Sequence, residues 1–248
     1  MKQYSLIFVL VIMLFFYSGC SGKSSGGDAL RGIESITTNN PANHNVDFYY
    51  YIPAVVRNNP EKSHPVLLCI PNSSRRGEDY AGTLFKMFAD KEGFILLAPT
   101  FQFEPSDFTE KRSYNFPRAW SGKAITDMID LLKKKHNLSL AKIYIHGNLE
   151  GAEAAIRFSL LKPDLIASVS AHGINDIIFP REKNTIKYFI TTDTDNEDRL
   201  QNAQNFVVHA KRHGIDVEFK RMGGLNELPR EQITESLELF KKVNAAQK

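Results

Sequence analysis

The chain alternates short apolar runs with longer segments in which apolar residues recur at helical spacing. Seven runs have the length and the β-branched or aromatic content of strands, at residues 47–54, 65–71, 93–99, 142–147, 166–173, 186–192 and 217–222. The spacing between them predicts helices over residues 80–93, 122–137, 151–163, 198–214 and about 230–244. Near-continuous apolar strands joined by helices predict an α/β fold, with a mostly parallel sheet covered on both faces.

The N-terminus has the form of a lipoprotein secretion signal. A single early lysine is followed by an apolar run over residues 6–17, too short for a membrane span, and then by "SGC", which ends at Cys20. These three residues resemble the end of a bacterial lipobox, in which the cysteine becomes lipidated after cleavage. An ordinary signal peptide with an incidental cysteine is the alternative. We expect residues 1–19 to be a signal peptide, 20–29 a lipidated cysteine with a Gly/Ser-rich tether, and 30–248 one domain.

Because the predicted lipid would insert into a membrane, we expect the chain to be anchored to a membrane of the bacterial cell envelope, its predicted partner. Ser21 is not the acidic residue that retains some lipoproteins in the inner membrane, so the resemblance indicates the outer membrane. The 31 basic and 28 acidic side chains are scattered and nearly balanced, which gives no indication of nucleic-acid binding. No cofactor or metal is indicated. Cys69 lies in the apolar run "VLLCI" and is predicted to be a small buried hydrophobic residue.

The stretch "HGNLEG", residues 146–151, carries the main functional signal. It lies between a predicted strand and a predicted helix, and it spaces Gly147 and Gly151 as in the GxSxG nucleophile elbow, where the two glycines let the chain double back. The central position, which holds the nucleophile in such enzymes, is Leu149. A leucine has no atom that can attack a carbonyl or carry a proton. We expect either that the strained turn has relaxed or that Leu149 packs into the former pocket.

The chain resembles the α/β-hydrolase superfamily, and within it secreted esterases such as polyhydroxybutyrate depolymerases and feruloyl esterases. The resemblance covers roughly residues 47–240 and is carried by residues 65–101, 119–173 and 191–229. It implies an α/β-hydrolase fold without a large cap domain. It also implies triad positions at Leu149, at Asp195 in "TTDTD", whose carboxylate would orient a histidine, and at Asn226, which occupies the histidine place before "ELP". An asparagine cannot act as a general base near neutral pH.

The same resemblance places the backbone N–H groups of an oxyanion site at Ser73 and Glu150. The usual "HG" after the oxyanion strand is replaced here by Pro71 and Asn72. Because loss of the nucleophile or the base costs about a million-fold in rate, we expect a pseudo-hydrolase that binds an unknown small molecule or protein ligand, or acts as a scaffold. One alternative is an active carboxylic ester hydrolase with a displaced nucleophile, at Ser73, Ser74, Ser168 or Ser170. Another is a purely structural surface lipoprotein.

Aromatic and histidine side chains are the remaining candidates for a pocket. Six aromatic residues occur in the loop that follows the strand at 93–99, among them Phe101, Phe103 and Trp120. They either form a wall for a ligand or fix the loop through their own packing. His146 and His172, at predicted strand ends, are either part of the site or structural histidines with satisfied hydrogen bonds.

Overall fold

The computed structural model describes residues 28–40, 43–102, 113–222 and 229–247. One sheet has the strand order β1-β2-β4-β3-β5-β6-β7-β8. Its strands are β1 Leu30–Thr37, β2 Asn45–Ile52, β3 Ser63–Ile70, β4 Ile95–Thr100, β5 Ser139–Asn148, β6 Ile166–His172, β7 Lys187–Asp193 and β8 Val217–Met222. The strands from β4 to β8 in this order pair in parallel, whereas β2 is antiparallel to both β1 and β4. The predicted mostly parallel sheet is therefore confirmed.

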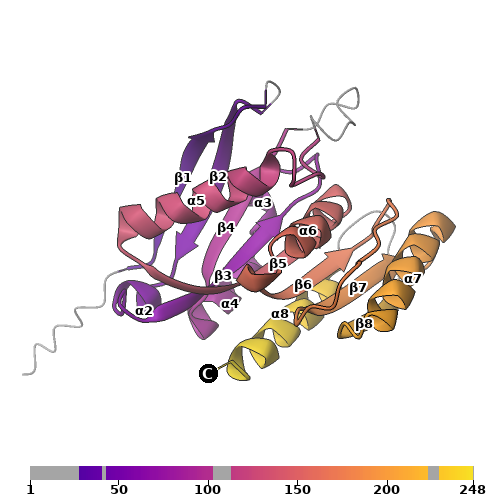
Figure 1. Ribbon diagram of the computed structural model, residues 1–248. Helices are drawn as coiled ribbons and strands as arrows, with labels where there is room; N and C mark the ends of the chain where they lie inside the picture. The colour runs from indigo at the N-terminus through magenta and orange to yellow at the C-terminus, as the bar shows by residue number, and fades with distance from the viewer. Residues whose placement is uncertain (1–27, 41–42, 103–112, 223–228, 248) are drawn as a thin grey trace, which may run out of the picture.

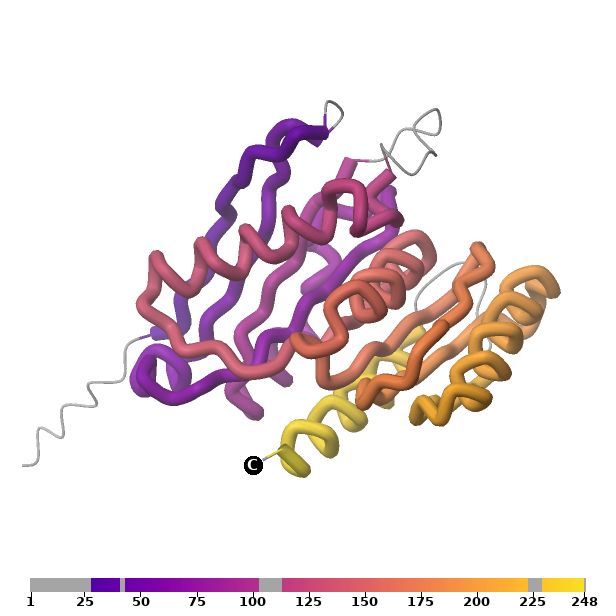
Figure 2. Tube along the Cα trace, viewed as in Figure 1, coloured from indigo at the N-terminus to yellow at the C-terminus, as the bar shows by residue number. Residues whose placement is uncertain are grey.

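Helices cover both faces of the sheet (Figure 1). They are α2 Ala54–Arg57, α3 Gly77–Tyr80, α4 Thr83–Glu92, α5 Ser121–His136, α6 Glu150–Leu161, α7 Glu197–Arg212 and α8 Arg230–Ala245. Figure 2 shows α5, α6 and α7 side by side on one face, while the C-terminal α8 lies on the other. The connecting helices make the parallel strand order possible, because a parallel pair needs a long crossover.

Alternate strand residues supply two hydrophobic cores, one on each face of the sheet. Leu68 and Ile145 belong to the core under α5, α6 and α7, whereas their chain neighbours Leu67 and Tyr144 belong to the core under α4 and α8. Cys69 lies in the second core with no exposed surface, and burial raises the pKa of its thiol. It is the buried hydrophobic residue that the sequence predicted.

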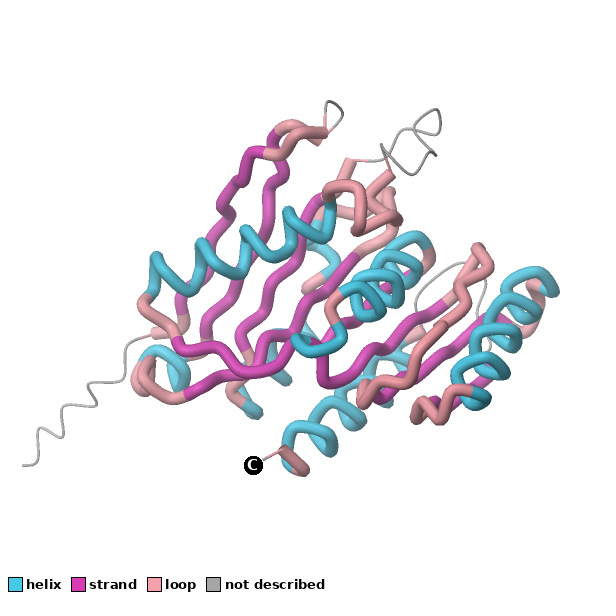
Figure 3. Tube along the Cα trace, in the orientation of Figure 1, coloured by secondary structure: helices cyan, strands magenta, loops and turns pink. Residues whose placement is uncertain are grey.

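One crossover differs from the others. Residues 173–186, which join the parallel strands β6 and β7, contain no helix, although each of the other parallel crossovers does. Figure 3 shows this connection as a loop that runs across the sheet beside α6 and α7. Over the ranges described, no helix combines the length and the hydropathy needed to cross a bilayer.

Candidate functional site

The turn between β5 and α6 has the backbone of a nucleophile elbow. Leu149, its central residue, has φ 52° and ψ −119°, a region that non-glycine residues seldom occupy. Its backbone N–H donates a hydrogen bond of 2.8 Å to the carbonyl oxygen of His172 at the end of the neighbouring strand. The turn has therefore not relaxed, although its central residue is a leucine.

The two glycines of the motif are required by close contacts between backbone segments. A Cβ atom on Gly147 would lie 2.3 Å from the carbonyl oxygen of Gly151, and one on Gly151 would lie 2.2 Å from that of Ile70 at the end of β3. Neither contact involves the side chain at position 149. The glycines thus hold the turn against the sheet whatever residue occupies its centre.

The side chain of Leu149 packs at the carboxyl end of the sheet. It is half-buried, and its Cδ2 atom would lie 2.8 Å from a Cβ atom on Gly173, the first residue after β6. The Cδ atom of Arg199, from α7, would lie 3.9 Å from the same Cβ position. Leu149 therefore occupies the space between the elbow, the end of β6 and the start of α7.

A buried carboxylate at the end of β7 belongs to Asp193, not to Asp195. Asp193 ends β7 and is 4% exposed; its Oδ1 lies 3.2 Å from His172 Nε2, and its Oδ2 accepts a 2.6 Å hydrogen bond from Arg199 Nη1. Asp195 is exposed and accepts a hydrogen bond from the hydroxyl of Thr194, at 2.9 Å. Sequence reasoning passed over Asp193, and the available signal was its place as the last residue of a buried strand.

His172 is a buried histidine with both ring nitrogens engaged. Its Nδ1 lies 2.9 Å from Thr191 Oγ1, and its Nε2 faces Asp193. Burial lowers the pKa of the imidazole; the Asp193 carboxylate opposes that shift and the Arg199 guanidinium adds to it. Thr191, His172 and Asp193 thus form a hydroxyl–imidazole–carboxylate series, but the Thr191 hydroxyl lies within β7 and has no exposed surface. A substrate carbonyl cannot reach it.

His146 lies in a buried polar network on the face of the sheet that α8 covers. Its Nδ1 accepts from the hydroxyl of Tyr80 and its Nε2 donates to Gln232 Oε1, both at 2.8 Å. The amide of Gln232 in turn donates to Ser170 Oγ at 2.9 Å, and Ser170 lies 2.6 Å from Ser236 Oγ. Burial lowers the pKa of His146 to about 4, so the ring is neutral. These bonds connect α3 and α8 to the sheet.

Several other residues were predicted from the sequence to belong to the site. Glu150 begins α6, and the half-buried Ser73 follows β3. Phe101 and Trp120 are buried with Tyr114, with ring centroids 4.9 Å apart for Phe101–Tyr114 and 5.5 Å for Phe101–Trp120. Within residues 28–40, 43–102, 113–222 and 229–247, no hydrogen bond joins a serine or cysteine side chain to a histidine. Cys20, Phe103 and Asn226 lie outside the described residues.

One buried acid in α6 was not identified from the sequence. The side chain of Glu153 is 1% exposed; its Oε2 accepts from Asn115 Nδ2 at 2.9 Å and its Oε1 from the backbone N–H of Asn175 at 3.0 Å. Arg157 Nη1 lies 3.6 Å away. Burial raises the pKa of Glu153 to about 7, against the opposing effect of Arg157. Glu153 thus connects α6 to the loop before α5, through Asn115, and to the loop after β6, through Asn175.

Comparison with known proteins gives distant relatives. No protein-family model matches the chain. Acetylxylan esterase A of Emericella nidulans is 24% identical over 173 residues, which make up 68% of this chain and 55% of that protein. The chain thus spans little more than half the length of the curated relatives it matches.

Solved structures match over most of the chain. A ferulic acid esterase superposes with a TM-score of 0.66 at 13% identity, covering 87% of this chain and 98% of its own. The poly(3-hydroxybutyrate) depolymerase LpqC of Bordetella parapertussis gives a TM-score of 0.61 at 13% identity, covering 90% and 91%. The chain therefore has the α/β-hydrolase fold.

Proposed function

We propose that this protein has lost serine-dependent ester hydrolysis and that its elbow region binds a ligand without cleaving it. The observation that carries the proposal is Leu149 at the centre of a turn that keeps the elbow backbone, with φ 52°. Removal of the nucleophile alone lowers the rate of such an enzyme by about a million-fold, because the triad acts as a unit.

The surroundings of Leu149 support this proposal. The buried carboxylate of Asp193 is engaged by His172 on one oxygen and by Arg199 on the other. Arg199 thereby holds a fixed positive charge against this carboxylate. In a catalytic triad the carboxylate would instead orient a histidine that transfers protons. The sequence adds Asn226 at the histidine position. Leucine and asparagine thus stand at the nucleophile and base positions that the resemblance implies, and the buried carboxylate of Asp193 is engaged on both of its oxygens.

The competing function, ester hydrolysis, is suggested by the names of the similar proteins. Acetylxylan esterase A and ferulic acid esterase are ester hydrolases by name, so an active carboxylic ester hydrolase with a displaced nucleophile is the alternative. The fold alone does not decide between the two. In open α/β folds ligands bind outside the carboxyl ends of the strands, which is where Leu149 and Arg199 lie.

A covalent probe tests the proposal. The purified full chain is incubated with a fluorophosphonate and, separately, with short-chain nitrophenyl esters, beside an active ferulic acid esterase. We expect neither labelling nor turnover from the wild-type chain. The Leu149→Ser and Asn226→His double variant tests whether the remaining scaffold accepts the probe at position 149. Labelling of a wild-type serine, with turnover abolished when that serine is replaced by alanine, would overturn the proposal.

We also propose attachment to a membrane of the cell envelope through lipid on Cys20. The support is the apolar run at residues 6–17 followed by "SGC", and Ser21 favours the outer membrane. The wild-type chain and a Cys20→Ser variant are expressed in a bacterium, and their membrane fractions and N-terminal peptide masses are compared. The wild type is expected in the membrane fraction with a diacylglyceryl mass on Cys20. A cleaved, unmodified N-terminus would contradict this.

A further inference from the structure

A groove of about 850 Å³ lies on the sheet face that carries α5, α6 and α7. Three segments line it: residues 116–119, residues 157–163 from the end of α6 onward, and residues 177–184. The elbow residue Leu149 and its neighbours Gly173 and Asp193, at the ends of β6 and β7, are not among its lining. The groove is thus separate from the elbow turn.

The groove follows from the crossover that lacks a helix. Parallel strands are usually joined by a helix that covers the sheet, and residues 173–186 supply only an extended loop beside α6. Large apolar side chains remain accessible there: Ile177 is 52% exposed and Phe179 is 46% exposed, with the half-buried Leu160 between the segments. Apolar surface of this kind within a concavity is typical of a ligand site.

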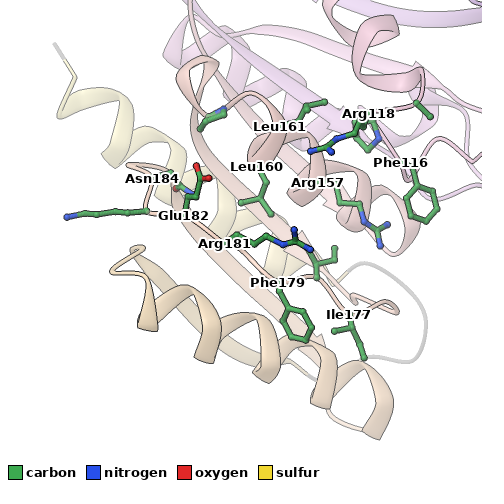
Figure 4. A pocket seen from close by; sticks show the side chains of 15 residues that line it. Phe116, Arg118, Arg157, Leu160, Leu161, Ile177, Phe179, Arg181, Glu182 and Asn184 are labelled. Carbon is green, nitrogen blue, oxygen red and sulfur yellow. The ribbon is translucent and has the colours of Figure 1, made fainter. Parts of the chain in front are cut away.

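Positive charge gathers at the same groove. Arg118, Arg157 and Arg181 come from the three lining segments, and Figure 4 shows their side chains around one opening beside Leu160. Arg157 is held in place: its guanidinium lies 4.5 Å from the ring centre of Phe116 and pairs with Asp176.

The remaining charges of the lining are not neutralised by the protein. Arg118, Arg181 and Lys183 are exposed, and within the part of the chain that the structure describes none of them forms an ion pair. Glu182 is the acidic residue of the lining. The lining of the groove therefore combines exposed apolar side chains with an excess of positive charge.

We propose that this groove binds an amphiphilic carboxylate, that is, a small organic acid with an apolar chain. Its carboxylate lies between the guanidinium groups of Arg118 and Arg181, and its chain lies along Leu160 and Ile177. Guanidinium groups match the planar geometry of a carboxylate and bind it through paired hydrogen bonds. The volume falls within the range of about 300–1,000 Å³ that small-molecule sites occupy.

Calorimetry with a matched series of probes tests the proposal. The full chain is titrated with octanoate, with octanol, which has the same chain and no charge, and with octylammonium, which has the opposite charge. We expect octanoate to bind most tightly and octylammonium not to bind. An Arg118→Glu and Arg181→Glu double variant should weaken octanoate binding by about tenfold or more, as expected for loss of hydrogen bonds to a charged group. Arg212→Glu, at the exposed end of α7, is the matched control and should leave the affinity unchanged.

Three results would overturn the proposal. The first is equal binding of octanoate and octylammonium, and the second is an octanoate affinity that the double variant leaves unchanged. The third is binding of an acidic amphipathic helical peptide, lost in the double variant, with no binding of octanoate; this would assign the groove to a protein partner. Because the substituted residues lie outside the elbow, none of these results depends on whether the chain hydrolyses esters.

Discussion

Leu149 packs so closely onto Gly173 that a Cβ atom at position 173 would lie 2.8 Å from Leu149 Cδ2. Both residues have positive φ, 52° and 73° respectively. The leucine at the elbow is therefore fitted to the end of β6, where its neighbour has no side chain. This pair links the strained turn to the strand that carries His172.

A Gly173→Ala substitution is expected to lower the free energy of unfolding by about 1–3 kcal/mol, through positive-φ strain and the clash with Leu149. In a Leu149→Ala background the clash is absent, so the second substitution should cost less. Urea denaturation of the two single variants and the double variant measures this coupling. Strictly additive effects would show that the two side chains do not compete for space.

Glycine and alanine at position 149 should reverse their usual order of stability. Alanine keeps the Cβ atom that is disfavoured at φ 52° and ψ −119°, whereas glycine adopts this conformation freely. We therefore expect Leu149→Gly to be more stable than Leu149→Ala by about 1 kcal/mol, measured by urea denaturation at one pH. An alanine variant as stable as the glycine variant would mean that the turn relaxes when the leucine is removed.

Glu153 should make stability fall as pH rises. Its pKa of about 7 in the folded protein exceeds the ordinary value of 4.5, so between these values the folded state holds a proton that the unfolded state has lost. The loss of stability across this range is about 3 kcal/mol for a group so deeply buried.

A Glu153→Gln variant removes this titration. Asn115 can reorient to it, because Asn115 Oδ1 is buried without a hydrogen-bond donor. The variant should be more stable than the wild type at pH 8 and similar to it at pH 5, in urea denaturation at both values. An equal stability difference at the two pH values would show that Glu153 does not titrate in this range.

Arg199 should hold down the pKa of His172. Its guanidinium lowers that pKa by charge repulsion, whereas Asp193 raises it. In an Arg199→Gln variant the pKa of His172 is therefore expected to rise, as followed by the imidazole ¹H and ¹³C shifts in an NMR titration. Arg212→Gln, at the far end of the same helix, is the control and should leave the titration unchanged. A lower pKa in the first variant would exclude this role of Arg199.

The elements with a strong local period could be predicted from the sequence. The strand pattern anticipated all strands from β2 to β8, and α5 and α7 begin and end within two residues of their predicted bounds. The exception is β1, whose sequence "LRGIESIT" has no fully buried residue and only alternates half-buried with exposed positions. Its pairing with β2 depends on tertiary contacts, which a local pattern does not contain.

The residues of the candidate site differ in the same way: a local motif predicts some of them, and tertiary contacts bring the others together. Gly147, Leu149 and Gly151 are close in sequence, so their spacing alone identified the turn. The contacts of Asp193 with His172 and Arg199 join β7, β6 and α7, and they follow from strand register and helix position rather than from any short motif. The groove has a similar origin, since it depends on a helix that residues 173–186 do not form.

Gly147 and Gly151 make position 149 a useful place to attach a chemical group. Because Gly147 and Gly151 hold the backbone, a side chain placed at 149 projects from a fixed location at the start of α6. A cysteine introduced there would ionise readily at a helix N-terminus, whereas Cys69 is buried and its thiol is held protonated. Position 149 thus offers a site for a spectroscopic label or a tethered ligand on a rigid scaffold.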